Sequence, residues 1–131
     1  MSVVVGYIPT HEGQAALAHA KREALERGRT LVVVNTSRGD ALVDPRYALD
    51  DELAELRAEM EASGVTFLFW HRMSGRDAAE EILEAAEMND ADVIVIGLRK
   101  RSPVGKLLLG STAQRILFDA ACPVLTVKEA P

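Results

Sequence analysis

The chain has 131 residues, of which 48% are hydrophobic and 27% charged, a composition typical of one globular domain covering residues 1–131. Its apolar runs are too short for a membrane-spanning helix, and because the first residues show no secretion signal we expect a cytoplasmic protein. The formal net charge of −5 argues against general binding to nucleic acid, which needs a basic surface. A single cysteine, Cys122, excludes an internal disulfide and is interpreted as a small buried side chain.

The first half of the chain alternates apolar runs with helical patterns. Residues 2–8 predict a buried strand, and residues 13–27 predict a helix that ends at Gly28. Residues 30–35 predict a second strand, which an irregular stretch over 36–48 follows. Apolar residues then recur at helical spacing in a second helix that ends at Gly64. The predicted inward faces of these two helices comprise Leu17, Ala20, Ala24, Leu25, Leu49, Leu53, Leu56 and Met60.

The second half continues the alternation. Residues 65–70 predict an aromatic-rich third strand, and Ser74 or Gly75 leads into a third helix. Residues 93–96 predict the fourth strand, 111–121 the last helix and 123–128 the fifth strand. The predicted inward faces of these helices comprise Ala79, Ile82, Leu83, Ala86, Ala113, Ile116, Leu117 and Ala120. The helical glutamates are interpreted as solvated: Glu23, Glu26, Glu55, Glu59, Glu80, Glu81 and Glu84.

Buried strands alternating with amphipathic helices are typical of the α/β class, in which helices cover both faces of a parallel sheet. We therefore expect a three-layer, doubly wound fold with right-handed crossovers. In such folds, ligands bind beyond the carboxyl ends of the strands, where the strand order reverses. The loops after the first, second and fourth predicted strands are the candidate binding segments.

The segment from residue 92 to 128 carries the clearest functional signal. Gly97 ends a buried strand, and Gly110 precedes a helix that opens with Ser111 and Thr112. Between the glycines lie Arg99, Lys100, Arg101 and Lys106, four of the 15 basic residues of the chain. Basic side chains beside the free N–H groups of a helix start predict an anion site, most plausibly for phosphate. The alternatives are a solvated basic loop and a plain N-cap at Ser111, and a cap is compatible with an anion site.

Motifs of other sites are missing from the sequence. No dinucleotide fingerprint follows a strand, and Lys100 stands where a P-loop needs its first glycine. His11, His19 and His71 are isolated in the sequence, and no cluster has zinc-ligand spacing. No nucleophile–base pair is visible. We therefore expect neither a catalytic residue nor a protein-bound metal, and no role as an enzyme.

The pattern Asp92-Val-Ile-Val-Ile-Gly97, then Gly110-Ser111-Thr112-Ala-Gln-Arg-Ile-Leu, then Cys122-Pro-Val-Leu resembles the universal stress protein (UspA-like) family. The resemblance implies a Rossmann-like, adenine nucleotide alpha hydrolase-like sheet of five parallel strands in the order 3-2-1-4-5. It also implies a homodimer that forms through the strand at residues 123–128. One branch of the family binds ATP through a glycine, two residues, a glycine, nine residues, a glycine, and then serine or threonine.

This sequence matches that ATP-binding pattern in part. Gly97, Gly110 and Ser111 stand at their expected positions, whereas Lys100 replaces the second glycine. Ile8 stands where the ATP-binding branch commonly has an acidic residue, while Thr10 keeps the hydroxyl two positions on. Lys100 adds bulk that would block a triphosphate, or a charge that would neutralise it.

Two functions therefore remain open. In the first, the protein is a regulatory module that binds an adenine nucleotide such as ATP, with Mg²⁺ as a companion and Asp40 as the nearest candidate ligand for that ion. In the second, the protein acts without a nucleotide, through protein partners that dock on the basic loop. For the first function the implied nucleotide-binding residues are Ile8, Pro9, Thr10, Val34, Asn35, Gly97, Arg99, Lys100, Gly110, Ser111 and Thr112.

Overall fold

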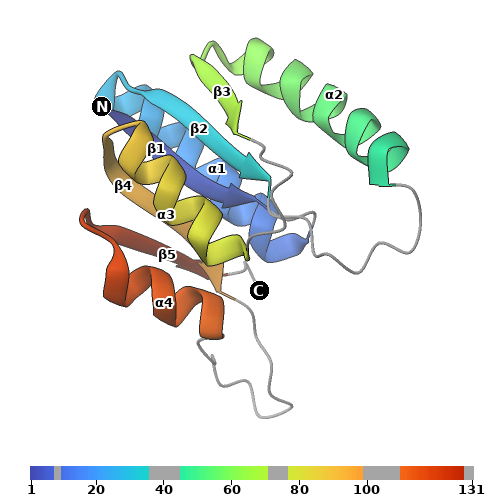
Figure 1. The fold of residues 1–131 in the computed structure, drawn as a ribbon. Helices are drawn as coiled ribbons and strands as arrows, with labels where there is room; N and C mark the ends of the chain where they lie inside the picture. The colour runs from blue at the N-terminus through green and yellow to red at the C-terminus, as the bar shows by residue number, and fades with distance from the viewer. Residues whose placement is uncertain (8–9, 36–44, 71–76, 99–109, 129–131) are drawn as a thin grey trace.

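Five strands pair into one parallel sheet in the order β3-β2-β1-β4-β5 (Figure 1). A computed structural model describes residues 1–7, 10–35, 45–70, 77–98 and 110–128, without the side chains of residues 45–53. The strands are β1 (Ser2–Tyr7), β2 (Thr30–Asn35), β3 (Phe67–Trp70), β4 (Ala91–Leu98) and β5 (Val124–Lys128). The helices are α1 (His11–Arg27), α2 (Pro45–Ser63), α3 (Ala78–Met88) and α4 (Ser111–Asp119). The predicted α/β class and strand order are confirmed.

The helices cover both faces of the sheet, which gives three layers (Figure 1). Helices α1 and α2 share one face, and α3 and α4 share the other. Because the strands are parallel, their last residues gather at one end, called here the carboxyl end of the sheet. Among the described residues no helix is both long enough and apolar enough to cross a membrane.

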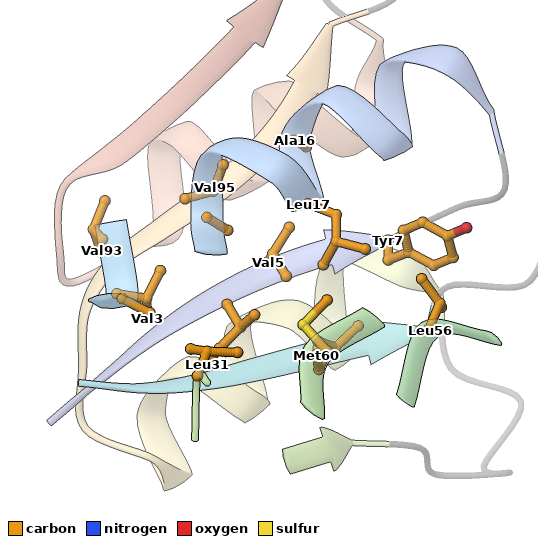
Figure 2. Packing of buried hydrophobic residues seen from close by; sticks show 14 residues of the cluster. Val3, Val5, Tyr7, Ala16, Leu17, Leu31, Leu56, Met60, Val93 and Val95 are labelled. Atoms are coloured by element: carbon orange, nitrogen blue, oxygen red, sulfur yellow. The ribbon is translucent and has the colours of Figure 1, made fainter. Parts of the chain in front are cut away.

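The alternation of side chains along β1 divides the core into two clusters. Val3, Val5 and Tyr7 point toward α1 and α2, whereas Val4 points toward α3 and α4. Figure 2 shows the first cluster, in which Leu17 of α1 and Met60 of α2 meet the strand side chains. Each fully buried aliphatic side chain contributes about 1.5–3 kcal/mol relative to exposure. These two clusters hold the strand ends in fixed relative positions.

Several helices and one strand begin or end at other residues than predicted. Helix α1 begins at His11 because the Thr10 hydroxyl caps it, and it ends at Gly28, whose φ of 65° is left-handed. Helix α2 begins at Pro45, inside the stretch predicted to be irregular. Helix α3 begins at Ala78 with Asp77 as its cap, instead of near Ser74 or Gly75. Strand β4 is longer than predicted, because it covers Ala91–Leu98.

For three side chains, the sequence predicted the wrong degree of burial. Leu25 and Leu117 are exposed by 48% and 39%, so their predicted inward orientation is wrong. Each directly follows a buried neighbour, and a step of about 100° turns the next residue to the margin of the buried face. Glu81 was predicted to be solvated, yet it is buried.

Candidate functional site at the carboxyl end of the sheet

The predicted binding residues gather at the carboxyl end of the sheet. Tyr7 of β1 pairs with Asn35 of β2 in the strand register, and Gly97 of β4 pairs with Val127 of β5. The first turns of α1 and α4 lie at this same end (Figure 1). Of the predicted residues, Ile8, Pro9, Arg99, Lys100 and the candidate Mg²⁺ ligand Asp40 lie outside the described residues.

Thr10 has a structural role at this end of the sheet. Its side-chain oxygen accepts a hydrogen bond from the N–H of Gly13 at 3.1 Å. This N-cap satisfies one of the N–H groups that the start of α1 leaves without a helical partner. The Thr10 hydroxyl, which the sequence predicted to bind a nucleotide, therefore also fixes the residue at which α1 begins.

Val34 and Asn35 are the last two residues of strand β2, and their side chains point to opposite faces of the sheet. The Val34 side chain is fully buried and belongs to the core on the α3 and α4 side. It can therefore meet a ligand only through its backbone. Asn35 is 7% exposed, and its side chain points to the opposite face because successive strand residues alternate. An amide there offers both donor and acceptor groups beside the end of β1.

Gly97 is required by the packing of the protein itself. A Cβ atom at this position would overlap the backbone carbonyl oxygen and carbon of Glu12, in the first turn of α1. Backbone atoms cannot move aside as a flexible side chain can, so only glycine lets α1 approach β4 this closely. This contact brings the start of α1 against the end of β4, two of the predicted binding segments.

Gly110, unlike Gly97, is not required by packing against the described residues. Its φ is −68°, which any residue can adopt, and a Cβ there would meet nothing within 4 Å among the described residues. It is the N-cap of α4, and no side chain among the described residues caps that helix. The alternative of a plain N-cap at Ser111 is therefore wrong, because Ser111 is the first helical residue.

The start of α4 offers N–H groups to a ligand. The Gly110 carbonyl accepts the first helical hydrogen bond, from the Gln114 N–H at 3.0 Å. The N–H groups of Ser111, Thr112 and Ala113 precede that bond and have no acceptor within the helix. Ser111 and Thr112 are exposed. Uncapped donors at the positive end of a helix dipole bind anions.

Sequence reasoning missed two groups of residues near this site. Glu12 is 7% exposed and supplies the backbone that packs on Gly97, but a glutamate in a first helical turn gives no sequence signal of burial. Arg115 of α4 binds Asp77 and Glu80 of α3. A signal existed for this pair, because Asp77 and Glu80 have the spacing of a capping box.

Cys122 follows α4 and is partly buried. Burial raises the pKa of its thiol, and the negative charge of Asp92 raises it further. The nucleophilic thiolate is therefore disfavoured. Cys122 was predicted to be buried, and it packs against the core on the α3 and α4 side while remaining only partly buried.

The opposite end of the sheet carries an open hollow. It is lined by Ala24, Leu25, Gly28, Arg29, Thr30, Gly64, Val65 and Thr66. This hollow contains none of the predicted binding residues. Within the described ranges, no group of three or more His, Cys, Asp or Glu side chains is arranged to hold a metal ion.

Comparison with known proteins agrees with this architecture. The sequence profile of the universal stress protein family matches residues 1–128. A universal stress protein from Mycolicibacterium smegmatis is 47% identical over 126 residues, which cover 96% of each chain. The structure of a universal stress protein from Archaeoglobus fulgidus matches with a TM-score of 0.80 and 29% identity, over 98% of both chains.

Two further structures share the fold at lower identity. One is the universal stress protein from A. fulgidus in complex with dAMP, with a TM-score of 0.77 and 24% identity over 98% of both chains. The other is a universal stress protein in complex with cAMP, with a TM-score of 0.67 and 23% identity, over 99% of this chain and 98% of that one.

Proposed function

This chain belongs to the universal stress protein family, and from that membership we propose that it is a cytoplasmic regulatory module that binds ATP at the carboxyl end of its sheet. The observation that carries the proposal is the start of α4. Gly110 has neither a conformational nor a packing reason to be glycine among the described residues. We infer that a glycine at this position leaves room for a ligand beside the uncapped N–H groups.

The described residues fit the parts of an adenine nucleotide. The N–H groups of Ser111, Thr112 and Ala113 would hold the phosphates, helped by the two hydroxyls. The ends of β1 and β2 would hold the adenosine, where Asn35 supplies polar groups at a largely apolar end of the sheet. We assign the module a regulatory role and no catalytic step, with Mg²⁺ as a companion of the triphosphate.

The dAMP and cAMP complexes support this assignment. They show that proteins of this fold accept adenine nucleotides, although at their level of identity the likeness to this chain concerns the fold. ATP as the ligand rests on the sequence pattern of Gly97, Gly110 and Ser111.

A second candidate function is docking of protein partners without a nucleotide. One observation favours it: Gly97 and Thr10 are needed for packing and capping. These two family residues would therefore persist in a chain that had lost its ligand. Gly110 distinguishes the two functions, because the described part of the structure gives it no such role.

We also propose that the protein forms a homodimer through β5. This strand is the edge of the sheet, and its apolar side chains from Val124 to Val127 are only partly buried. On the neighbouring helix α4, Leu117 and Phe118 are exposed by 39% and 83%. An unpaired strand edge next to exposed apolar side chains favours pairing with a second copy.

Thermal unfolding with and without Mg-ATP tests the nucleotide proposal. At a hundred times its dissociation constant, a ligand stabilises the folded state by about 2.7 kcal/mol, which raises the midpoint by on the order of 5 °C or more. The sharpest variant is Thr112→Glu, because a carboxylate in the first turn favours the helix dipole but repels phosphate. We expect it to fold normally and to lose the ATP shift.

Thr66→Glu is the matched control, since Thr66 is exposed at the opposite end of the sheet. It adds the same charge and should keep the full ATP shift. An ATP shift that survives Thr112→Glu would contradict the assigned phosphate position. The absence of any shift of the wild-type chain with ATP, ADP, AMP, dAMP, cAMP or GTP at millimolar concentration would favour the second function.

A further inference from the structure

We propose that Arg115 is a positioning residue, which holds the first turn of α4 in the orientation that phosphate binding needs. The inference rests on the proposed nucleotide site and adds to it a residue that does not touch the ligand. Arg115 lies four residues, or about one helical turn, after Ser111. Its side chain reaches the start of α3.

Arg115 binds three carboxylates at once. Its Nη1 donates to Asp77 Oδ2 at 3.0 Å and its Nη2 to Glu80 Oε1 at 3.3 Å. Its Nε lies 3.7 Å from Asp119 Oδ2, one turn further along α4. The planar guanidinium offers five donors in a rigid fork, whereas an ammonium group offers three from a single atom at the end of a flexible chain. Arg115 therefore fixes α4 to the start of α3.

Helix α4 has a narrow buried face among the described residues. Ile116 is its one fully buried side chain, while Ala113 and Ala120 pack only partly against the core. A helix of nine residues is too short to be stable by itself, so its orientation depends on tertiary contacts. Arg115 adds a polar contact with α3 to these apolar ones, and this contact would help the N–H groups of the first turn to keep one direction.

Arg115 also sets the local charge near the proposed phosphates. Without its positive charge, the carboxylates of Asp77, Glu80 and Asp119 would lose this shared cation. Arg115 itself lies about 5.4 Å, one helical turn, along α4 from Ser111, which is within the Debye length at physiological salt, about 8 Å. Repulsion would therefore grow with the number of phosphate charges. A purely structural contact would affect adenosine and ATP alike.

Asp77 connects this cluster to the cap of α3. One carboxylate oxygen accepts from the Glu80 N–H at 2.9 Å, and the other accepts from Arg115. Asparagine caps helices as well as aspartate does. Asp77→Asn therefore removes the ion pair and keeps the cap, which separates the positioning role from the stability of α3.

The test is calorimetric titration of adenosine, AMP and ATP into the wild-type chain and the variants Arg115→Met, Arg115→Lys and Asp77→Asn. Because these ion pairs are partly exposed, we expect moderate effects. Arg115→Met should weaken ATP binding on the order of tenfold, weaken AMP binding less and leave adenosine unchanged. The ATP affinity of Arg115→Lys should lie between those of the wild type and Arg115→Met, because lysine keeps the positive charge but lacks the planar guanidinium. Asp77→Asn should weaken ATP binding, and its effect should not add to that of Arg115→Met.

Arg27→Met is the matched control. Arg27 forms a surface ion pair of 2.9 Å with Glu23 at the far end of α1, so its loss changes the net charge equally and should leave all three affinities unchanged. Equal losses for adenosine, AMP and ATP in Arg115→Met would overturn the positioning role, as would ATP affinity within twofold of wild type. A wild-type chain that binds none of the three ligands would overturn the proposed function, and this inference with it.

Discussion

At the scale of single residues, two glycines of one sequence pattern have different reasons to be glycine. Gly97 leaves room for the backbone of Glu12, so the folded protein needs it whether or not a ligand binds. Gly110 has an ordinary φ, and a Cβ there would meet no atom of the described residues within 4 Å. A sequence pattern treats both positions alike, whereas the structure separates a packing requirement from a candidate ligand contact.

Gly97→Ala tests this separation. We expect it to lower the free energy of unfolding by about 1–3 kcal/mol, because the new methyl group overpacks against backbone atoms of α1. Gly110→Ser should change it by only a few tenths of a kcal/mol in the stabilising direction, because serine is the better N-cap. Urea unfolding of both variants measures the difference. Comparable destabilisation by the two substitutions would show that Gly110 also has a packing role.

At the scale of elements, helix α4 takes part in both proposed interactions, nucleotide binding and dimerisation. Its first turn carries the proposed phosphate position, and its last turn carries Phe118, which is 83% exposed. Exposed apolar residues are common when they are single. Here Leu117 and Phe118 are two consecutive exposed apolar residues, and the chain leads from them into the partly buried edge strand β5.

Phe118→Lys should therefore convert a dimer into a monomer. A lysine near the end of α4 suits the helix dipole and should leave the fold intact, but its charge cannot be buried against a second copy. Light scattering should give twice the 14.2 kDa of one chain for the wild type and that single mass for the variant. Met88→Lys is the control, since Met88 is 62% exposed in the last turn of α3. Dimers that persist in Phe118→Lys would place the interface elsewhere.

The elements also show what the sequence could predict. Strand order, helix number in the described ranges and most of the core followed from apolar runs and family resemblance. The start of α3 was missed although Asp77 and Glu80 carried a capping signal. Leu25 and Leu117 were misplaced because hydrophobicity fixes an apolar stripe only to within its margins. The contact of Glu12 with Gly97 joins residues far apart in sequence, and no local pattern encodes it.

At the scale of the whole molecule, charge and topology favour the carboxyl end of the sheet as the place where an anion binds. The chain carries a net charge of −5, so an anionic ligand meets general repulsion except where helix dipoles oppose it. The helices α1 and α4 both begin at this end (Figure 1). The Thr10 hydroxyl caps α1, whereas no side chain in the described ranges caps α4, which favours the start of α4 as the stronger anion site of the two.

The most direct test of this account is a titration of the ¹⁵N-labelled chain with Mg-ATP, followed through its backbone amide resonances. We predict that the amides of Ser111, Thr112 and Ala113 shift most, because their N–H groups would donate to the phosphates, and that Asn35 shifts with them. Shifts confined to the opposite hollow around Gly28 and Gly64, or none at millimolar ATP, would contradict the assignment of the start of α4 as a nucleotide site.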